Sequence, residues 1–143
     1  MKIYLSSPFF NDNEIKNMRK TQDILERKGH KVFVPMDIQI PENLDEIERA
    51  KNIFNQDKVG IDECDAVVLL YYGIYSDSGT AWECGYAYAK NKPVIVVHCQ
   101  NKEPNNLMIT MGSFVNLPDI EALKTYDLHN PKQSTFYGHT TLS

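Results

Sequence analysis

Short apolar runs alternate along this chain with stretches whose apolar residues recur at helical spacing. The runs are predicted strands, and they cover Ile3–Leu5, Lys31–Val34, Ala66–Tyr72, Pro93–His98 and Phe114–Leu117. The third run, AVVLLYY, contains no charged residue and is typical of a central parallel strand that is buried on both faces.

Helical spacing predicts a helix after each of the first three strands. Asn11 or Asp12 begins the first helix, and Gly29 ends it as the C′ residue. The other expected helices run from Leu44 to about Ile61, through the stretch SDSGTAWECGYAYA to about Asn91, from about Asn106, and over Asp119–Lys124. The tail from Tyr126 onward is polar and is expected to be irregular.

This alternation of strands and helices predicts an α/β fold with right-handed crossovers. We expect a single domain over residues 1–143, with a flavodoxin-like, doubly wound, parallel five-stranded sheet of order 2-1-3-4-5 and helices on both faces. Such sheets bind ligands beyond the carboxyl ends of their strands. The segments SSPFFND, PMDIQI, YGIYSDSGTAWE and HCQNKEPNN follow the first four strands, so their carboxylates, amides and aromatic rings are expected to converge on one crevice.

Composition narrows the choice of ligand. The chain has 143 residues, a net charge of −4, and scattered rather than clustered lysines and arginines. Binding to a nucleic-acid backbone is excluded by this pattern, because it needs clustered cations. The three cysteines are isolated and odd in number, which favours free thiols over disulfides or zinc. We expect a cytoplasmic protein that makes no membrane contact, because no apolar stretch approaches the length of a membrane span.

Motifs for phosphate binding and for serine nucleophiles are missing from the sequence. The sequence contains no G-x-G-x-x-G motif and no P-loop motif, which bind phosphates, and no G-x-S-x-G motif, which positions a serine nucleophile. The helix start at Gly79, in DSGT, resembles an anion-binding site, but the neighbouring Asp77 would repel a phosphate. A nucleotide-phosphate cradle therefore remains only an alternative, and His98, at a strand end, is more often structural.

Carboxylates supply the chemistry that remains. Asp37, Asp57, Asp77 and Glu83 are all expected near the crevice, and two carboxylates in different environments suit the breaking of a glycosidic bond. Structural alternatives remain open at this point. Thr80 to Glu83 fits the capping box T-x-x-E, Asp77 and Asn106 could each be an N-cap, Tyr4 could be a core aromatic, and Phe10 could be part of an apolar plug.

The pattern D-S-G-T-A-x-E-x-G-Y-A from Asp77 to Ala87 resembles the nucleoside 2-deoxyribosyltransferase family. So do KIYLSSPFF at the start, PMDIQ after the second strand and NLM at 106–108, in the same order along nearly the whole chain. The resemblance implies exchange of the base of a 2′-deoxynucleoside for another base. It implies that Glu83 is the nucleophile at C1′, that Tyr4 orients this glutamate, and that Asp57 passes a proton to and from the base.

The resemblance also implies the groups that bind the substrate. Asp77 and Asn106 are expected to hold sugar hydroxyls, with Asn106 coming from a neighbouring subunit. Gln39 is expected to contact the base, Phe10 to line the pocket, and Met108 to bind substrate beside Asn106. The implied partners are 2′-deoxynucleosides and free purine or pyrimidine bases, with no cofactor and no metal. The implied assembly is a homo-oligomer built from dimers, up to a hexamer.

Two rival functions remain open on the sequence. An N-glycoside hydrolase of nucleosides or nucleoside 5′-monophosphates would use the same carboxylates, although Asp77 favours a 5′-hydroxyl over a phosphate. A non-catalytic sensor of nucleosides would keep the crevice without needing Glu83. Trp82, directly before Glu83, could join Phe9 and Phe10 in a dry stacking surface that biases the choice of base, or it could only pack. In short members of the family the C-terminal carboxylate lies in the active site, and whether Ser143 reaches the pocket here is left open.

Overall fold

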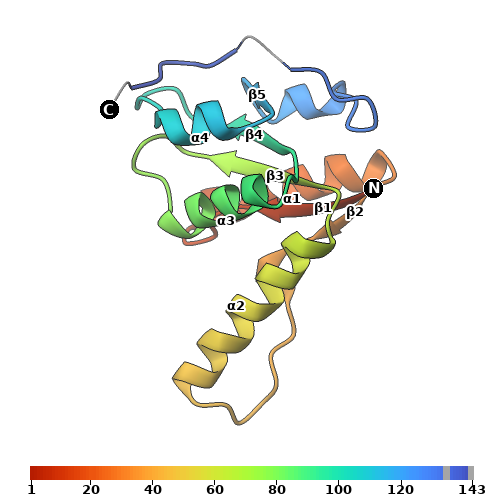
Figure 1. Ribbon diagram of the computed structural model, residues 1–143, viewed down its shortest axis with the longest axis vertical. Helices are drawn as coiled ribbons and strands as arrows, with labels where there is room; N and C mark the ends of the chain where they lie inside the picture. Colours follow the sequence, from red (N-terminus) through yellow and green to blue (C-terminus); the bar gives the residue numbers. More distant parts are fainter. Residues whose placement is uncertain (134–135, 142–143) are drawn as a thin grey trace.

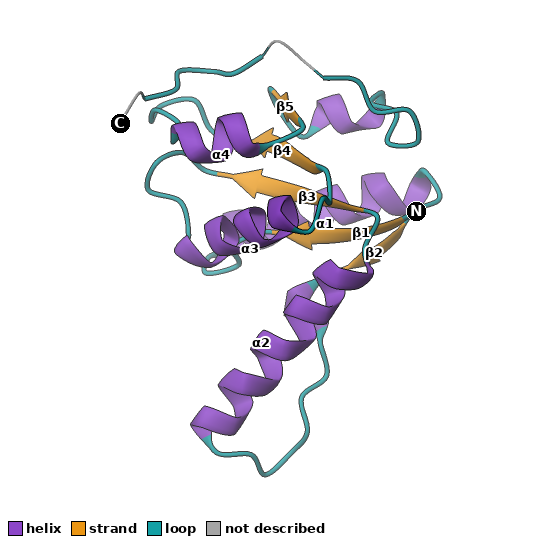
Figure 2. Cartoon of the chain, in the orientation of Figure 1, coloured by secondary structure: helices purple, strands orange, loops and turns teal. Residues whose placement is uncertain are grey.

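The computed structural model describes residues 1–133 and 136–141, so Ser143 lies outside the described residues. Its core is a five-stranded parallel sheet of order β2-β1-β3-β4-β5, which confirms the predicted fold (Figures 1 and 2). The strands are β1 (Lys2–Ser6), β2 (Lys31–Phe33), β3 (Ala66–Tyr71), β4 (Val94–His98) and β5 (Val115–Leu117). Each lies within one or two residues of a predicted run.

The helices are α1 (Asp12–Arg27), α2 (Glu46–Glu63), α3 (Ser78–Ala89) and α4 (Leu107–Gly112). Two short 3-10 helices, η1 (Pro35–Asp37) and η2 (Glu121–Lys124), complete the pattern. The last predicted α-helix is therefore a 3-10 turn. The second helix begins at Glu46 rather than Leu44, because Asp45 and Glu48 form a reciprocal capping box there. Gly29 follows α1 with a positive φ of 90°, as predicted.

Helices cover both faces of the sheet. On one face α1 and η2 pack over a core that includes Ile3, Leu5 and Val68. On the other face, α3 and the end of α2 pack over Tyr4 and Val67, residues that alternate with the first set along β1 and β3. The strands consequently direct Tyr4 toward α3.

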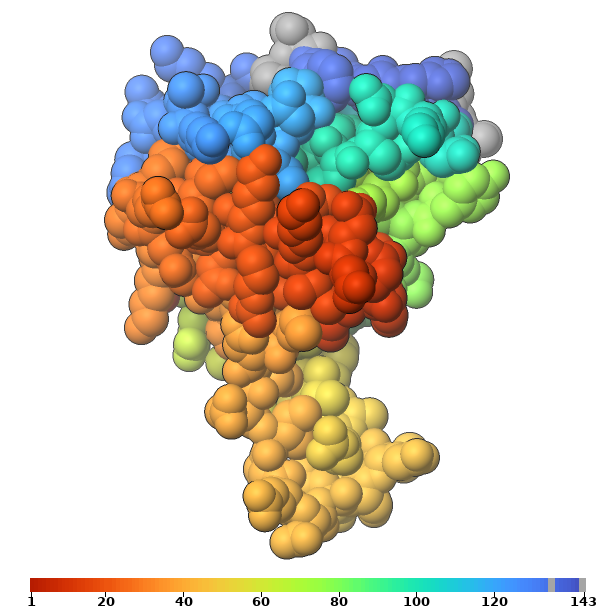
Figure 3. Space-filling model, turned by 180° about the vertical axis from the view of Figure 1, so that it is seen from behind, coloured from red at the N-terminus to blue at the C-terminus, as the bar shows by residue number. Residues whose placement is uncertain are grey.

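The first half of α2 projects from the body of the molecule as an arm, together with the segment that precedes it. Figure 1 shows this arm below the sheet, and Figure 3 shows it from behind in orange and yellow. Residues 45–55 are exposed apart from Asn52, whereas burial begins at Gln56 and becomes complete at Gly60 and Ile61. Asp57 therefore lies where α2 enters the body of the protein.

None of the helices in the described part of the chain combines the length and apolar character that crossing a bilayer requires. The three cysteines are unpaired; Cys64 and Cys84 are buried and Cys99 is partly so. Among residues 1–133 and 136–141, no group of three or more His, Cys, Asp and Glu side chains is arranged to hold a metal ion.

Candidate active site

Glu83 lies in the second turn of α3, on the side of the helix that faces β1. The Tyr4 hydroxyl donates a hydrogen bond to Oε2 of Glu83, and the Ser6 hydroxyl donates to Oε1 over 3.3 Å. The capping-box alternative for Glu83 is wrong, because α3 begins earlier. Its N-cap is Asp77, whose carboxylate accepts the backbone N–H of Thr80 at 3.0 Å. The Glu83 carboxylate is consequently not used to cap the helix.

Both donors come from one face of β1. Tyr4 and Ser6 are two residues apart, so their side chains point the same way, and both are fully buried. The Tyr4 ring stacks on Phe33 with centroids 5.3 Å apart. Burial, and then the charge of Glu83, raise the pKa of the Tyr4 hydroxyl far above its usual range, so it remains a protonated donor. The strand thus holds both oxygens of Glu83 in place.

Burial raises the pKa of Glu83 to about 7. The hydrogen bonds from Tyr4 and Ser6 oppose this shift by favouring the charged form, and the nearby charges of Asp57 and Asp77 add to it. At neutral pH the carboxylate is therefore present in both its ionised and its protonated form. An ionised, poorly solvated carboxylate is a competent nucleophile.

Asp57 lies near Glu83 and has a different environment. Burial raises its pKa to about 6. Its Oδ1 atom is buried and, within the described residues, has no hydrogen-bond partner. An acid with a pKa near neutrality and a free oxygen can transfer a proton to a ligand. Asp57 and Glu83 are therefore two neighbouring carboxylates in different environments, an arrangement that suits glycosidic chemistry.

The two carboxylates share a pocket of about 300 Å³ between α2 and α3. Apolar side chains form much of its wall. The residues that line it are Phe54, Asp57, Lys58, Ile61, Gly79, Trp82 and Glu83. We refer to it as the α2–α3 pocket. Lys58 is paired with Asp62 at 3.2 Å, so this cation is held by a carboxylate outside the pocket lining.

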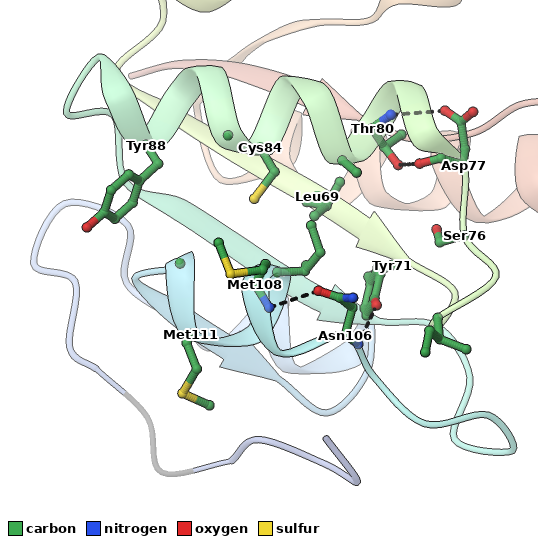
Figure 4. A pocket seen from close by; sticks show the side chains of 16 residues that line it. Leu69, Tyr71, Ser76, Asp77, Thr80, Cys84, Tyr88, Asn106, Met108 and Met111 are labelled. Atoms are coloured by element: carbon green, nitrogen blue, oxygen red, sulfur yellow. Dashed lines mark hydrogen bonds between the residues drawn. The ribbon is translucent and has the colours of Figure 1, made fainter. Parts of the chain in front are cut away.

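A second and larger hollow, of about 620 Å³, lies on the other side of α3, between α3 and α4 (Figure 4). We call it the α3–α4 groove. Asn106 and Met108 line it, together with Asp77, and Tyr4, Asp57 and Glu83 do not. The single crevice expected from the strand ends is thus divided into two within one chain.

Asn106 is rigidly held in this groove. Its Oδ1 accepts the backbone N–H of Met108 at 2.8 Å, which makes it the N-cap of α4, and its own N–H donates to the Tyr71 hydroxyl at 2.9 Å. Met108 is 73% exposed. Figure 4 shows Asn106, Met108 and Tyr88 facing the groove.

The remaining predicted binding residues lie at the surface. Phe10 follows β1, stacks on Phe9 and is 79% exposed. Gln39 follows η1 and is exposed, and its backbone oxygen accepts a hydrogen bond from Gln56, the residue before Asp57. The backbone of Gln39 is thus tied to α2 beside one of the two carboxylates. Asp37 instead forms a bidentate salt bridge with Arg19, with a shortest N–O distance of 2.5 Å, and it does not line the α2–α3 pocket.

The sequence prediction missed Ser6 as a partner of Glu83. The two-residue periodicity of a strand was the signal that could have identified it, because Ser6 shares a face with Tyr4. The contact between Phe54 and Trp82 was also missed, and it carried no local sequence signal because the two residues lie on different helices.

Comparisons with known proteins point to one family. A family model described as nucleoside 2-deoxyribosyltransferase matches residues 3–117. A nucleoside deoxyribosyltransferase of Lactobacillus johnsonii is 32% identical over 68% of this chain, a match that spans 66% of that relative. The solved 2-deoxyribosyltransferase of Bacillus psychrosaccharolyticus is 33% identical, with a TM-score of 0.83 over 95% of this chain and 100% of that one. A CMP N-glycosidase of Clostridium botulinum shares the fold alone, at 20% identity and a TM-score of 0.61 over 88% of this chain and 100% of that one.

Proposed function

The chain belongs to the nucleoside 2-deoxyribosyltransferase family, a family of pentosyl-transferring enzymes, and we propose that it moves 2-deoxyribose from one nucleobase to another through a covalent bond to Glu83. The observation that carries this proposal is the Glu83 carboxylate, held at both oxygens by Tyr4 and Ser6 and facing a pocket that it shares with Asp57. A capping or structural glutamate has no need of this arrangement.

In the first step, Glu83 attacks C1′ of a bound 2′-deoxynucleoside while the bond from C1′ to the base nitrogen breaks. The electron pair of that bond leaves with the base, and Asp57 donates a proton to it. The product is an ester between Glu83 and the sugar, with inverted configuration at C1′.

In the second step, a different base attacks C1′ and displaces the Glu83 carboxylate. Asp57, now ionised, accepts the proton that the incoming base loses. Because each displacement inverts C1′, the new nucleoside retains the configuration of the old one. The 2-deoxy sugar favours this chemistry, because it lacks the electron-withdrawing hydroxyl that would oppose positive charge at C1′.

Tyr4 and Ser6 act on the charge of Glu83 in both steps. Their hydroxyls stabilise the charge of Glu83 before attack and again when the carboxylate leaves. Since both are buried and carried by a strand, they do not need to reorganise between the steps. Asp77, at the start of α3, supports binding of a sugar hydroxyl, and its fixed negative charge opposes a 5′-phosphate at that helix end.

The position of Asn106 and Met108 supports a site completed by a second subunit. Both lie in the α3–α4 groove rather than beside Glu83 of their own chain, and the groove carries exposed apolar side chains, including Tyr88 and Met111. We infer that a second copy of the chain covers this groove. Asn106 and Met108 of one chain then lie beside Asp57 and Glu83 of the other. The chain would then act as a homo-oligomer built from dimers.

The test of the proposed function is a base-exchange assay. The protein is incubated with 2′-deoxyinosine, with or without free cytosine, and the products are separated by chromatography. Deoxycytidine that forms only when cytosine is present supports transfer. Free deoxyribose and hypoxanthine without deoxycytidine would instead establish an N-glycoside hydrolase. A Glu83→Gln variant that exchanges bases at the normal rate would refute the role of Glu83.

A further inference from the structure

We propose that Trp82 and Phe54 form the wall on which the nucleobase stacks, and that this wall sets the preference of the enzyme between purines and pyrimidines. The proposal rests on the proposed function, because it takes a nucleobase as the ligand of the α2–α3 pocket. It adds two residues, from two helices, whose geometry is specific enough to test.

The wall is a cluster of aromatic rings beside the carboxylate pair. The Trp82 indole lies parallel to the Tyr86 ring, with centroids 5.2 Å apart and an interplanar angle of 10°. The Phe54 ring is inclined at 64° to the indole, with centroids 5.3 Å apart. Trp82 and Phe54 are nevertheless each 49% exposed. Since Tyr86 covers one face of the indole, we place the base against the opposite face.

The support behind this wall is fixed. The Tyr86 hydroxyl donates to Asp62 at 2.5 Å, and the ammonium groups of Lys58 and Lys90 lie 5.3 and 5.6 Å from the Tyr86 ring centroid. Trp82 therefore rests on a ring that is anchored at its hydroxyl and on its surface. An aromatic side chain that is already held in place loses little conformational entropy when a ligand stacks on it.

Asp57 provides the second observation, and it points to the chemistry of the ligand. Its buried Oδ1 has no hydrogen-bond partner within residues 1–133 and 136–141, and Asp57, Phe54 and Trp82 line the same pocket. A buried polar atom without a partner costs stability unless a ligand satisfies it. A nucleobase offers both complements: a flat π face for the indole and a ring nitrogen that exchanges a proton with Asp57.

The size of the base then determines how strongly it stacks. A two-ring purine covers more of the indole and of Phe54 than a one-ring pyrimidine does. Base–aromatic stacking changes binding by roughly 5- to 150-fold per base. The wall should therefore favour purines, and its removal should reduce that preference.

The sequence provides a direct probe, because Trp82 is the only tryptophan in the chain. On the proposed function, the Glu83→Gln variant should bind a nucleoside without cleaving it, so its tryptophan emission can be titrated with 2′-deoxyinosine and with 2′-deoxycytidine. We expect saturable quenching by both nucleosides, with tighter binding of deoxyinosine. Unchanged emission when equilibrium dialysis shows the nucleoside to be bound would overturn the proposal.

Kinetics of exchange in the wild-type background provide the second test. Trp82→Ala should lower kcat/KM for a purine acceptor by roughly 5- to 150-fold and for a pyrimidine acceptor by less, and Trp82→Phe should recover part of the loss. The matched control is Ile47→Ala, which removes an exposed apolar side chain at the start of α2, outside the pocket. An equal loss for both base classes, or no loss, would contradict a stacking wall.

These results separate the failure of this proposal from the failure of the proposed function. Normal base exchange with tryptophan emission that does not respond to bound nucleoside refutes the wall and leaves the transferase. Quenching by nucleosides in a protein that exchanges no bases supports the wall and refutes the transferase.

Discussion

Replacing Asp57 by asparagine should change the shape of the pH profile of the enzyme, and not only its rate. The proposed mechanism requires Glu83 to be ionised and Asp57 to be protonated. Burial places the pKa of Glu83 at about 7 and that of Asp57 at about 6, so the group that must be ionised is the weaker acid. The profile of kcat/KM should therefore be bell-shaped, with apparent pKa values of about 6 and 7 that belong to the coupled pair.

The size of the effect follows from these two values. At pH 6.5 each carboxylate is in its required state about a quarter of the time, so roughly one enzyme in sixteen is productive. In Asp57→Asn only the ionisation of Glu83 is required, so activity should rise to a plateau above pH 7 instead of falling. The acid limb of this variant reports the pKa of Glu83 alone, and that pKa should lie below its wild-type value, because the charge of Asp57 is one cause of the raised pKa of Glu83.

The assay measures kcat/KM for 2′-deoxyinosine between pH 5 and 9, in the wild type and in Asp57→Asn. Loss of the acid should lower the rate by about 10²- to 10⁴-fold near the optimum. A donor whose purine carries a methyl group at N7 is already positively charged and needs no proton to leave. Asp57→Asn should therefore cleave this donor at close to the wild-type rate.

Two results would refute this reasoning. An alkaline limb that persists in Asp57→Asn would mean that another group controls it. An equal loss on the ordinary and the N7-methylated donor would mean that Asp57 positions the substrate or the fold and does not supply a proton.

Three further predictions follow from the contacts of Glu83 and Asn106. Tyr4→Phe removes a hydrogen bond that lowers the pKa of Glu83. The pKa of Glu83 should therefore rise further, kcat should fall, and the higher of the two apparent pKa values should move to higher pH. These shifts are measured in pH–rate profiles, and an unchanged profile would contradict the prediction. Glu83→Gln should stabilise the protein more at pH 8 than at pH 5, by at most about 3 kcal/mol. The reason is that the pKa of Glu83 in the folded state lies above its ordinary value of 4.5, so the wild type loses stability as the pH rises from about 4.5 to 7. Equal shifts of the thermal midpoint at both pH values would show that Glu83 is not buried as described. Finally, mixing the Glu83→Gln and Asn106→Ala variants under conditions of subunit exchange should restore about a quarter of the wild-type activity. Half of the randomly formed dimers contain one chain of each variant, and each such dimer holds one intact site out of two. No recovery would place Asn106 in the site of its own chain.

The sequence predicted the sheet well because the three central strands, β1, β3 and β4, each contain an uninterrupted apolar run. It predicted the start of α3 poorly, because Asp77 and Thr80 are both good capping residues and lie three positions apart. Only the structure shows that Asp77 caps the helix, which leaves Glu83 to the hydroxyls of Tyr4 and Ser6. Local propensity could not distinguish the two, because the outcome depends on contacts with β1.

Asp57 shows a second limit of sequence reasoning. Helical periodicity places it on a face of α2 but does not say how far along α2 the helix enters the protein. In the structure the exposed arm ends just before Asp57, and the burial that follows raises its pKa. The aromatic wall of Phe54 and Trp82 likewise depends on the packing of α2 against α3, which no local pattern encodes.

The covalent bond between Glu83 and the sugar is the central claim, and rapid acid quenching tests it most directly. The enzyme is mixed with excess 2′-deoxyinosine without an acceptor base, quenched within the first turnover, digested and examined by mass spectrometry. We expect one deoxyribosyl group on the peptide that contains Glu83, formed in step with a burst of hypoxanthine and lost when cytosine is added before the quench. Base exchange at the normal rate with no sugar on that peptide at any time would contradict the account.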